Sequence, residues 1–416
     1  MAAESPLRIA FLTYRGNPHS GGQGVYARHL TRALADLGHH VEVFSGQPYP
    51  ELDPRVRLVR LPSFDLYNAA HPLRPGRRFE VGSLGDWAEL LTFATLAFPE
   101  PLAFSVRAWR ALRTRLGDFD VVHDNQSLGY GLLALRRAGV PVLATVHHPI
   151  AVDLRLELAR ATTARRRWLW RRWYAFVAMQ RRVAPRLARI VTDSDSSADD
   201  VRADLAVPAE RLHVVPVGVD PVAFAPRTDV AVVPGRIVTT ASADSAMKGL
   251  PHLLDALVQL RATRPDVSLV VIGTLKPDGP TARKIRDLGV GDAVTFVSGV
   301  SEERLVALYN EAAVVAVPSL YEGFSLPAIE AQACGRPLVA TTGGALPQVV
   351  GPDGETALLV PPGDAAALAA AIGRVLDDAA LAARLGAAGR ARVTATWTWQ
   401  HTAERMVQHY RAVARC

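Results

Sequence analysis

The sequence contains little cysteine and no long hydrophobic run. Its two cysteines, Cys334 and Cys416, cannot build a disulfide framework, which indicates a reduced, cytoplasmic protein. No uninterrupted apolar stretch approaches the roughly 20 residues that a membrane-spanning helix needs. Residues 1–6 also lack the basic and apolar regions of a signal peptide. These absences argue against a disulfide-rich secreted protein and against an integral membrane protein.

The overall composition is that of a globular protein, with 49% hydrophobic and 21% charged residues. A length of 416 residues exceeds one ordinary hydrophobic core. We therefore expect roughly two or three domains.

Basic residues gather in one stretch, residues 155–189, which holds eleven arginines against a single acid, Glu157. Apolar residues recur there at helical spacing and predict a helix whose core face is formed by Leu169, Trp173, Phe176, Val177, Val183, Ala184 and Leu187. A second face carries Arg165, Trp168, Arg172, Arg182 and Arg186. The region Arg165–Arg189 therefore presents either a solvated face or a surface for an anionic membrane. No nucleic-acid-binding motif accompanies it, so we expect no nucleic acid partner.

The first half opens with a Rossmann-like unit. A strand over residues 7–14 leads into a glycine-rich turn, residues 19–24, then a helix over residues 25–37 and a strand over residues 41–44. A nicotinamide-dependent enzyme usually carries an acid at the end of the second strand, to hold the ribose. Residues 43–46 read Val-Phe-Ser-Gly, without an acid, which weakens a dehydrogenase interpretation.

Histidines end two further strands of this half, residues 121–124 and 142–148. Open α/β sheets bind ligands at the carboxyl ends of their strands, which makes His123, His147 and His148 candidate site residues. Between them and the opening unit we predict a long loop over residues 65–87 and a helix over residues 102–116, as candidate acceptor-binding surface. Asp118-Phe119-Asp120 has the form of a metal-binding Asp-x-Asp, but it directly precedes a strand, so we interpret it as strand entry.

The second half starts at Ile237, after a polar, proline-bearing linker. Its most informative stretch is residues 318–337, which predicts a strand, a tight Glu-Gly-Phe-Ser turn, a short helix and a strand. Pro327 fits the first turn of that helix, and Gly335 with Pro337 ends it. The amides of residues 323–326 would form an anion site between Glu322 and Glu330. Such a site suits a sugar nucleotide, although a surface helix with solvated glutamates has the same pattern.

Several motifs, in order along nearly the whole chain, resemble the family-four retaining glycosyltransferases of the GT-B fold. They are Gly21-Gly22, Thr145-Val146-His147, residues 216–220, Lys248-Gly249, residues 318–330, residues 343–347 and residues 360–364. The resemblance implies an α/β protein in which two Rossmann-like domains face each other across a cleft. Residues 1–217 would form the acceptor-side domain and residues 218–398 the donor-nucleotide domain. Residues 399–416 would form a C-terminal helix that packs back on the first domain.

The resemblance also assigns roles. Glu330 would bind the donor ribose, and Glu322 the donor sugar, while the leaving diphosphate would be held by Lys248, Gly21, Gly22, Gly323, Phe324, Ser325 and Leu326. Ser242 stands where the family usually has an arginine and would supply a hydrogen bond without charge. His147 would line the reacting centre, with His123 and His148 toward the acceptor. No metal and no cofactor is implied.

The function implied is that of a retaining hexosyltransferase, which moves a sugar from a nucleotide sugar, expected to be a UDP-sugar, to an acceptor hydroxyl. The arginine- and tryptophan-rich stretch favours a membrane lipid or lipid-linked glycan as acceptor, with the protein peripheral on the inner face of the membrane. A small soluble acceptor is an alternative. So are a nucleotide-sugar epimerase of the same fold and a protein that binds nucleotide sugars without catalysis.

Overall fold

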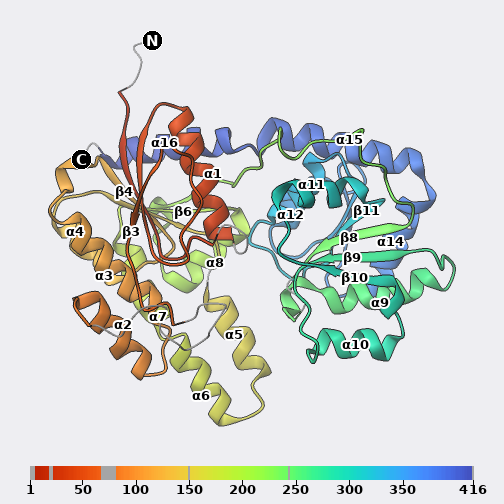
Figure 1. Ribbon diagram of the computed structural model, residues 1–416, viewed down its shortest axis with the longest axis horizontal. Coiled ribbons are helices and arrows are strands. Elements are labelled where there is room, and N and C mark those ends of the chain that lie inside the picture. Colours follow the sequence, from red (N-terminus) through yellow and green to blue (C-terminus); the bar gives the residue numbers. More distant parts are fainter. Residues whose placement is uncertain (1–4, 18–21, 67–80, 149, 242–243, 415–416) are drawn as a thin grey trace. The chain divides into compact units, whose positions relative to one another are not determined.

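The computed structural model describes residues 5–17, 22–66, 81–148, 150–241 and 244–414 (Figure 1). The chain divides into two compact units. The first comprises Met1–Val215 together with Thr402–Cys416, and the second comprises Pro216–His401. These boundaries lie a few residues from those that the sequence suggested.

The first unit is built on a seven-stranded parallel sheet of order β3-β2-β1-β4-β5-β6-β7. Its strands are β1 (Arg8–Thr13), β2 (His40–Ser45), β3 (Arg57–Arg60), β4 (Val121–Asn125), β5 (Val142–Val146), β6 (Arg189–Thr192) and β7 (Leu212–Val214). Its helices are α1 (Gly22–Asp36), α2 (Leu84–Ala94), α3 (Glu100–Leu112), α4 (Tyr130–Arg137), α5 (Ile150–Arg160), α6 (Ala164–Trp173), α7 (Phe176–Val183) and α8 (Asp195–Leu205).

The second unit has a six-stranded parallel sheet of order β10-β9-β8-β11-β12-β13. Its strands are β8 (Arg236–Thr240), β9 (Ser268–Ile272), β10 (Val294–Val297), β11 (Val314–Val317), β12 (Leu338–Thr341) and β13 (Leu358–Val360). Its helices are α9 (Leu250–Arg261), α10 (Pro280–Leu288), α11 (Glu302–Glu311), α12 (Leu326–Ala333), α13 (Leu346–Val350), α14 (Ala365–Asp377) and α15 (Ala379–Thr396). The final helix, α16 (Trp399–Ala414), belongs to the first unit from Thr402 onward.

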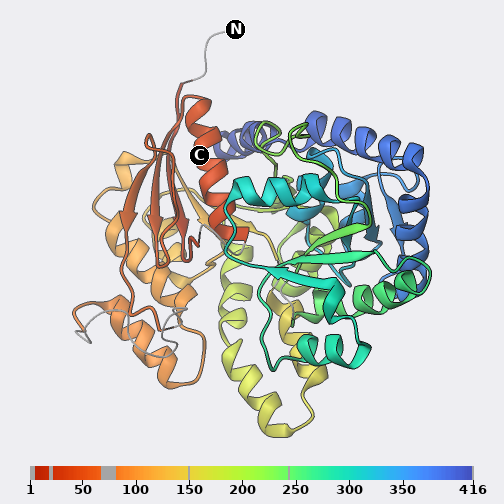
Figure 2. The same cartoon turned by 45° about the vertical axis from the view of Figure 1, so that its right-hand side comes forward.

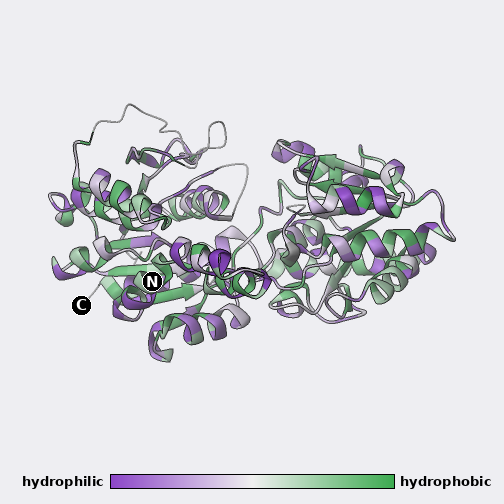
Figure 3. Ribbon diagram, turned by 90° about the horizontal axis from the view of Figure 1, so that it is seen from below, coloured by the Kyte–Doolittle hydropathy of each residue, from purple (hydrophilic) through white to green (hydrophobic). Residues whose placement is uncertain are grey.

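Helices cover both faces of each sheet (Figure 2), and hydrophobic residues concentrate in the strands (Figure 3). Central strands are therefore buried on both sides, as parallel sheets require. In β11 all four residues are buried, and in β4 and β5 all five are. The predicted α/β class with two Rossmann-like parts is confirmed. No helix in the described ranges combines the length and the apolar character needed to cross a membrane.

The arginine-rich stretch differs from its prediction as one helix with one core face. It forms three helices, α5, α6 and α7, because residues 161–163 interrupt it and the Thr163 side chain caps the start of α6. Val183, Ala184 and Leu187 are fully buried as predicted. Leu169 is not in the core but 37% exposed, since α6 has no buried residue. Arginines on every side of α6 leave it no continuous apolar face to bury.

Two other segments have boundaries in the structure that differ from the predicted ones. The loop predicted over residues 65–87 ends earlier, because α2 begins at Leu84 with the Ser83 side chain as its cap, and residues 67–80 lie outside the described residues. Helix α3 starts at Glu100 and ends at Leu112, earlier than predicted. A buried ion-pair cluster holds α2 to α3: Nη2 of Arg107 lies 2.8 Å from Asp86 and 2.6 Å from Glu89.

Candidate functional site

The loop between β11 and α12, in the second unit, has the open helix start that the sequence predicted. Ser325 precedes the helix with φ of 93° and ψ of 83°, a backbone conformation that costs energy for any residue other than glycine. No side chain caps the first turn, and Pro327 occupies that turn. Within the described part of the chain, the buried Ser325 hydroxyl has no hydrogen-bond partner. The helix start thus offers backbone N–H groups and a hydroxyl to an anion.

Glu322 and Lys248 form an ion pair beside this turn. The Lys248 ammonium donates to both carboxylate oxygens of Glu322, at 2.8 and 3.1 Å, and the Ser319 hydroxyl donates to the same carboxylate at 2.7 Å. The Glu322 side chain is only 11% exposed, whereas that of Lys248 is 33% exposed. The ammonium is therefore held in place yet remains accessible to a ligand.

Glycines bring the neighbouring backbone into contact with this loop. Gly249, with φ of 64°, lies so close to Pro318 that a Cβ would stand 1.8 Å from the Pro318 carbonyl oxygen. Gly344, with φ of 63°, lies equally close to Glu322, whose carbonyl would stand 2.3 Å from a Cβ. The N–H of Ala345 donates to that same carbonyl at 2.9 Å. The motifs at 248–249 and 343–347 thus fix the loop through backbone contacts.

Glu330 lies in the second turn of α12 and remains partly exposed. The Tyr309 hydroxyl donates to its Oε2 at 2.9 Å and lies 3.1 Å from the Thr240 hydroxyl. Burial raises the pKa of Glu330 to about 7, while the hydrogen bond from Tyr309 acts in the opposite direction. The carboxyl can therefore exist in either protonation state near neutral pH.

His147 follows β5 in the first unit, and both of its ring nitrogens face acceptors. Nδ1 lies 2.8 Å from Oδ2 of Asp193, and Nε2 lies 2.7 Å from Oδ1 of Asn125. The Asn125 amide nitrogen donates to the Gln23 carbonyl at 3.2 Å, which fixes Oδ1 as the atom that faces His147. Both ring nitrogens of His147 are therefore engaged within this cluster.

The His147 cluster stands at the carboxyl edge of the first sheet. Asn125 ends β4, His147 comes directly after β5, and Asp193 comes directly after β6. The ring of Tyr26, from α1, meets the His147 ring edge-on with centroids 4.4 Å apart. This is the edge where parallel α/β sheets bind ligands. Asp193 also keeps its other carboxylate oxygen, Oδ1, buried and without a partner among the described residues.

The other predicted histidines have different surroundings. His123 is fully buried, with Nδ1 2.7 Å from the Tyr410 hydroxyl and Nε2 2.7 Å from the Thr145 hydroxyl. Burial lowers its pKa to about 3, so the ring is neutral and serves packing inside the unit. His148 lies at the surface, with Nε2 3.1 Å from Oδ1 of Asp153.

Among the predicted glycines, Gly22 is the exposed first residue of α1, with open space where a Cβ would stand. Gly21 and Ser242 lie outside the described residues. Of the predicted turn residues, Phe324 and Ser325 are buried, while Gly323 and Leu326 are partly exposed. The four residues surround the start of α12.

Three residues of these clusters were missed by sequence reasoning: Asn125, Asp193 and Tyr309. A usable signal existed for two of them, because Asn125 and Asp193 are polar residues at the ends of buried strands. Nothing local marks Tyr309, whose contact with Glu330 is set by the packing of α11 against α12.

No group of histidine, cysteine or acidic side chains within the described ranges is arranged to hold a metal ion. The Asp-x-Asp motif is engaged in ion pairs instead. Asp120 lies 2.8 Å from Arg8, and Asp118 lies 2.9 Å from Arg115. These partners explain why the two acids stand at the entry of β4.

Comparison with known proteins agrees with this geometry. Residues 20–222 match the family described as Glycosyltransferase Family 4, and residues 231–392 match the family described as glycosyl transferases group 1. The chain is 53% identical, over 98% of its length and 99% of the relative, to MMP alpha-(1->4)-mannosyltransferase of Mycolicibacterium hassiacum. It is 31% identical, over 97% of its length and 91% of the relative, to D-inositol 3-phosphate glycosyltransferase of Stackebrandtia nassauensis. A solved structure, sucrose-phosphate synthase from Thermosynechococcus elongatus, superposes with a TM-score of 0.75 at 29% identity and covers 98% of both chains.

Proposed function

Because this chain belongs to the family-four glycosyltransferases of the GT-B fold, we propose that it transfers a mannosyl residue from a nucleoside-diphosphate sugar to a sugar hydroxyl, with retention at the anomeric carbon. The relative that is 53% identical is named for an alpha-(1->4) mannosyl linkage. Such a linkage joins C1 of mannose to an oxygen at position 4 of an acceptor sugar. The acceptor proposed here is therefore a saccharide.

The observation that carries the proposal is the pairing of an accessible ammonium with an uncapped helix start. Lys248 and the turn at residues 323–326 both supply positive potential for a departing diphosphate. Glu330, with Tyr309 behind it, would accept hydrogen bonds from the ribose hydroxyls. Glu322 would accept hydrogen bonds from the hydroxyls of the donor sugar.

The way in which Glu322 is bound argues against a covalent route to retention. A covalent mechanism needs a carboxylate that is available to attack the anomeric carbon. Glu322 instead accepts hydrogen bonds from Lys248 and Ser319, which lower its nucleophilicity. We infer a front-face reaction: the bond from C1 to the phosphate oxygen breaks, the acceptor oxygen bonds to C1 on the same face, and its proton passes to the departing phosphate.

His147 is the residue of the first unit that we assign to the reacting centre. It would line this centre with its ring held in place by Asp193 and Asn125. With both ring nitrogens already engaged, it is unsuited to act as a general base. This supports the assignment of the proton to the leaving phosphate.

The test is a panel of nucleoside-diphosphate sugars, incubated with α-mannosides as acceptors. We expect release of nucleoside diphosphate and a new α-mannosyl bond, identified by the anomeric coupling in NMR. UDP- and GDP-mannose supplied in parallel test the expected uridine base. If no donor and acceptor pair gave a product, the proposal would fail. Conversion of the donor sugar without release of nucleoside diphosphate would instead indicate an epimerase.

A second candidate concerns where the acceptor resides. Large apolar side chains of α2 are exposed, with Leu84 at 56%, Trp87 at 54% and Leu91 at 62%. Helix α6, rich in arginine, also exposes Trp168 at 53%. Exposed tryptophan beside arginine is typical of surfaces that bind anionic lipid, which favours a lipid-linked saccharide and a peripheral protein. Flotation with vesicles that contain phosphatidylglycerol tests this, and no binding at low salt would end the idea.

A further inference from the structure

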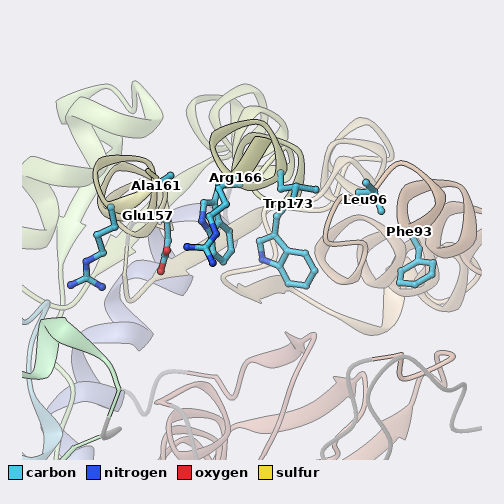
Figure 4. A pocket seen from close by; sticks show the side chains of 9 residues that line it. Phe93, Leu96, Glu157, Ala161, Arg166 and Trp173 are labelled. Atoms are coloured by element: carbon cyan, nitrogen blue, oxygen red, sulfur yellow. The ribbon is translucent and has the colours of Figure 1, made fainter. Parts of the chain in front are cut away.

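A cavity of about 640 Å³ lies in the first unit, between α2, α5 and α6 (Figure 4). It is lined by Phe93, Leu96, Glu157, Arg160, Ala161, Arg166, Leu169, Trp170 and Trp173. None of these residues belongs to the His147 cluster described above. The cavity is thus a second hollow on the same unit, with its own set of side chains.

The lining is charged at one end and apolar over the rest. In Figure 4, Glu157 and Arg166 stand at one side and Trp173 follows. Leu96, just after α2, and Phe93, in α2, continue the row. Leu96 is 51% exposed and so offers apolar surface at this end of the row. An apolar wall with a few charged groups at one end is the common composition of ligand pockets.

The walls of the cavity are fixed by hydrogen bonds. The Phe98 N–H donates to the Trp173 carbonyl at 3.1 Å, and the guanidinium of Arg172 donates to the Thr95 carbonyl at 3.0 and 2.9 Å. These bonds join the end of α6 to the segment that follows α2. The cavity therefore exists before any ligand binds, which lowers the entropic cost of binding.

Helix α5 connects this cavity to the His147 cluster. Its first turn holds Asp153, which contacts His148, the neighbour of His147. Glu157 and Arg160, later on the same helix, line the cavity. At a rise of 1.5 Å per residue, the charged end of the cavity begins roughly 6–10 Å along the helix axis from Asp153. Helix α5 therefore runs from the His148 contact at its start to the charged end of the cavity.

We propose that this cavity binds the distal sugar units of the acceptor, whose reacting hydroxyl lies near His147; the inference rests on the proposed function. One face of a pyranose ring presents C–H bonds and packs on aromatic rings such as Trp170 and Trp173. Its hydroxyls match the guanidinium groups and the carboxylate at the charged end. A hydrocarbon chain would desolvate that end without giving hydrogen bonds in return. The occupant is accordingly an oligosaccharide rather than an acyl chain.

The experiment compares α-(1→4)-linked mannosides of increasing length as acceptors. In the wild type, we expect the acceptor KM to fall once the chain is long enough to reach the cavity. Trp170→Ala and Arg166→Ala should raise KM for the long acceptors by about five- to tenfold. KM for methyl α-mannoside, KM for the donor and kcat at saturation should not change.

Matched variants separate binding from folding. Trp170→Phe keeps an aromatic face and should restore most of the affinity for long acceptors. Arg167→Ala removes a neighbouring arginine that does not line the cavity, and should behave as the wild type. Equal effects of Arg166→Ala and Arg167→Ala, or equal effects on short and long acceptors, would overturn the proposal. Octyl α-mannoside tests for an alkyl pocket. If its KM were as low as that of the oligosaccharide, and Trp170→Ala raised it equally, the cavity would bind alkyl chains and the assignment would be overturned as well.

A binding measurement keeps this test independent of turnover. Titration of the protein with the oligomannoside alone, followed by calorimetry, should show binding that Trp170→Ala weakens by the same factor. If transfer to methyl α-mannoside occurs without any effect of acceptor length, the cavity assignment fails and the proposed function stands. If no transfer occurs but the oligosaccharide binds, and Trp170→Ala weakens this binding, the proposed function fails and the cavity assignment stands. No binding at all would overturn the cavity assignment.

Discussion

The ammonium of Lys248 lies 2.8 Å from one carboxylate oxygen of Glu322 and 3.1 Å from the other. The pair joins the end of a short 3-10 turn, Ala246–Lys248, to the loop that precedes α12. Before a donor binds, the positive charge that a diphosphate would use is already oriented and partly neutralised. The two residues therefore act as a unit, but a substitution of Lys248 and a substitution of Glu322 should change turnover and diphosphate binding in different ways.

Replacement of Lys248 should reduce turnover. Lys248→Ala removes the charge that we assign to the leaving phosphate, and kcat should fall about 10²- to 10³-fold. The measurement is the initial rate of nucleoside diphosphate release at saturating donor. A matched control is Lys284→Ala, which removes another lysine paired with a carboxylate, Asp255 at 2.7 Å, on the α10 side of the second unit. An equal loss in both variants would contradict the assignment.

Replacement of Glu322 should separate affinity from rate. Glu322→Gln leaves the Lys248 ammonium without its counter-charge, so free nucleoside diphosphate should bind several-fold more tightly. The rate of sugar transfer should nevertheless fall, because the carboxylate no longer orders the donor sugar. Calorimetry with nucleoside diphosphate and the rate assay test the two parts. Weaker binding of the diphosphate would show that Glu322 supports the phosphate site rather than competes with it.

The pH dependence of donor binding should report Glu330. Its pKa is about 7 because of burial, so protonation below neutral pH removes an acceptor for ribose hydroxyls and raises the donor KM. Tyr309→Phe removes the hydrogen bond that opposes this shift, and should move the acidic limb of the profile to higher pH. Because folding raises this pKa above its ordinary 4.5, the wild type should lose stability as pH rises from there toward 7. Glu330→Gln should remove both dependences, and a profile that is unchanged in this variant would exclude Glu330 as the titrating group.

The orientation of the His147 ring should depend on Asp193. Asp193→Asn replaces the carboxylate that lies 2.8 Å from Nδ1 with an amide, and kcat should fall about 10- to 100-fold with the loss of this hydrogen bond. The initial rate of nucleoside diphosphate release and the ¹⁵N NMR signals of the His147 ring measure the two effects, and both should change in this variant. The control is Asp153→Asn, which alters the neighbouring His148 contact and should leave the His147 signals unchanged. A kcat and His147 ring signals that both stay at their wild-type values in Asp193→Asn would refute this dependence.

Ser325 should show a gain in stability at the expense of donor binding. Ser325→Gly relieves the φ of 93° and removes a buried hydroxyl that has no hydrogen-bond partner among the described residues, so the free energy of unfolding should rise by about 1 kcal/mol. The donor KM should rise as well, since Ser325 stands at the start of α12, where the phosphate is proposed to bind. Ser301→Gly is the contrasting control: Ser301 caps α11 in ordinary backbone geometry, and its loss should destabilise by a few tenths of a kcal/mol. Chemical denaturation measures both, and a loss of stability in Ser325→Gly would show that its backbone is not strained.

Features that depend on local geometry could be predicted from the sequence. Gly249 and Gly344 stand where the backbone must approach another backbone, and their motifs were recognisable. Likewise, His147 follows a buried strand, and the order of strands placed it at the ligand-binding edge. The position of His147 followed from periodicity and the rules of parallel sheets, whereas the two glycine motifs were recognised through the resemblance to the family.

Features that depend on distant packing could not be predicted in this way. His123 was predicted, like His147, to lie at the end of a strand, but it is the third of the five residues of β4. It is buried because Tyr410, 287 residues away, packs onto it. Similarly, helical periodicity cannot distinguish the buried Val183 from the exposed Leu169, because the difference lies in which helix has a partner.

The path of α16 has a consequence for how the protein is made. The chain leaves the first unit after Val215 and returns to it at Thr402, so residues 402–414 are synthesised after the whole second unit. Tyr410, fully buried against His123, is among them. The first unit therefore cannot complete its packing while the second is still being translated, although the N-terminal domain of a two-domain chain ordinarily folds first. A nascent chain held at residue 401 would present the β4–β5 region without its cover, as a substrate for chaperones.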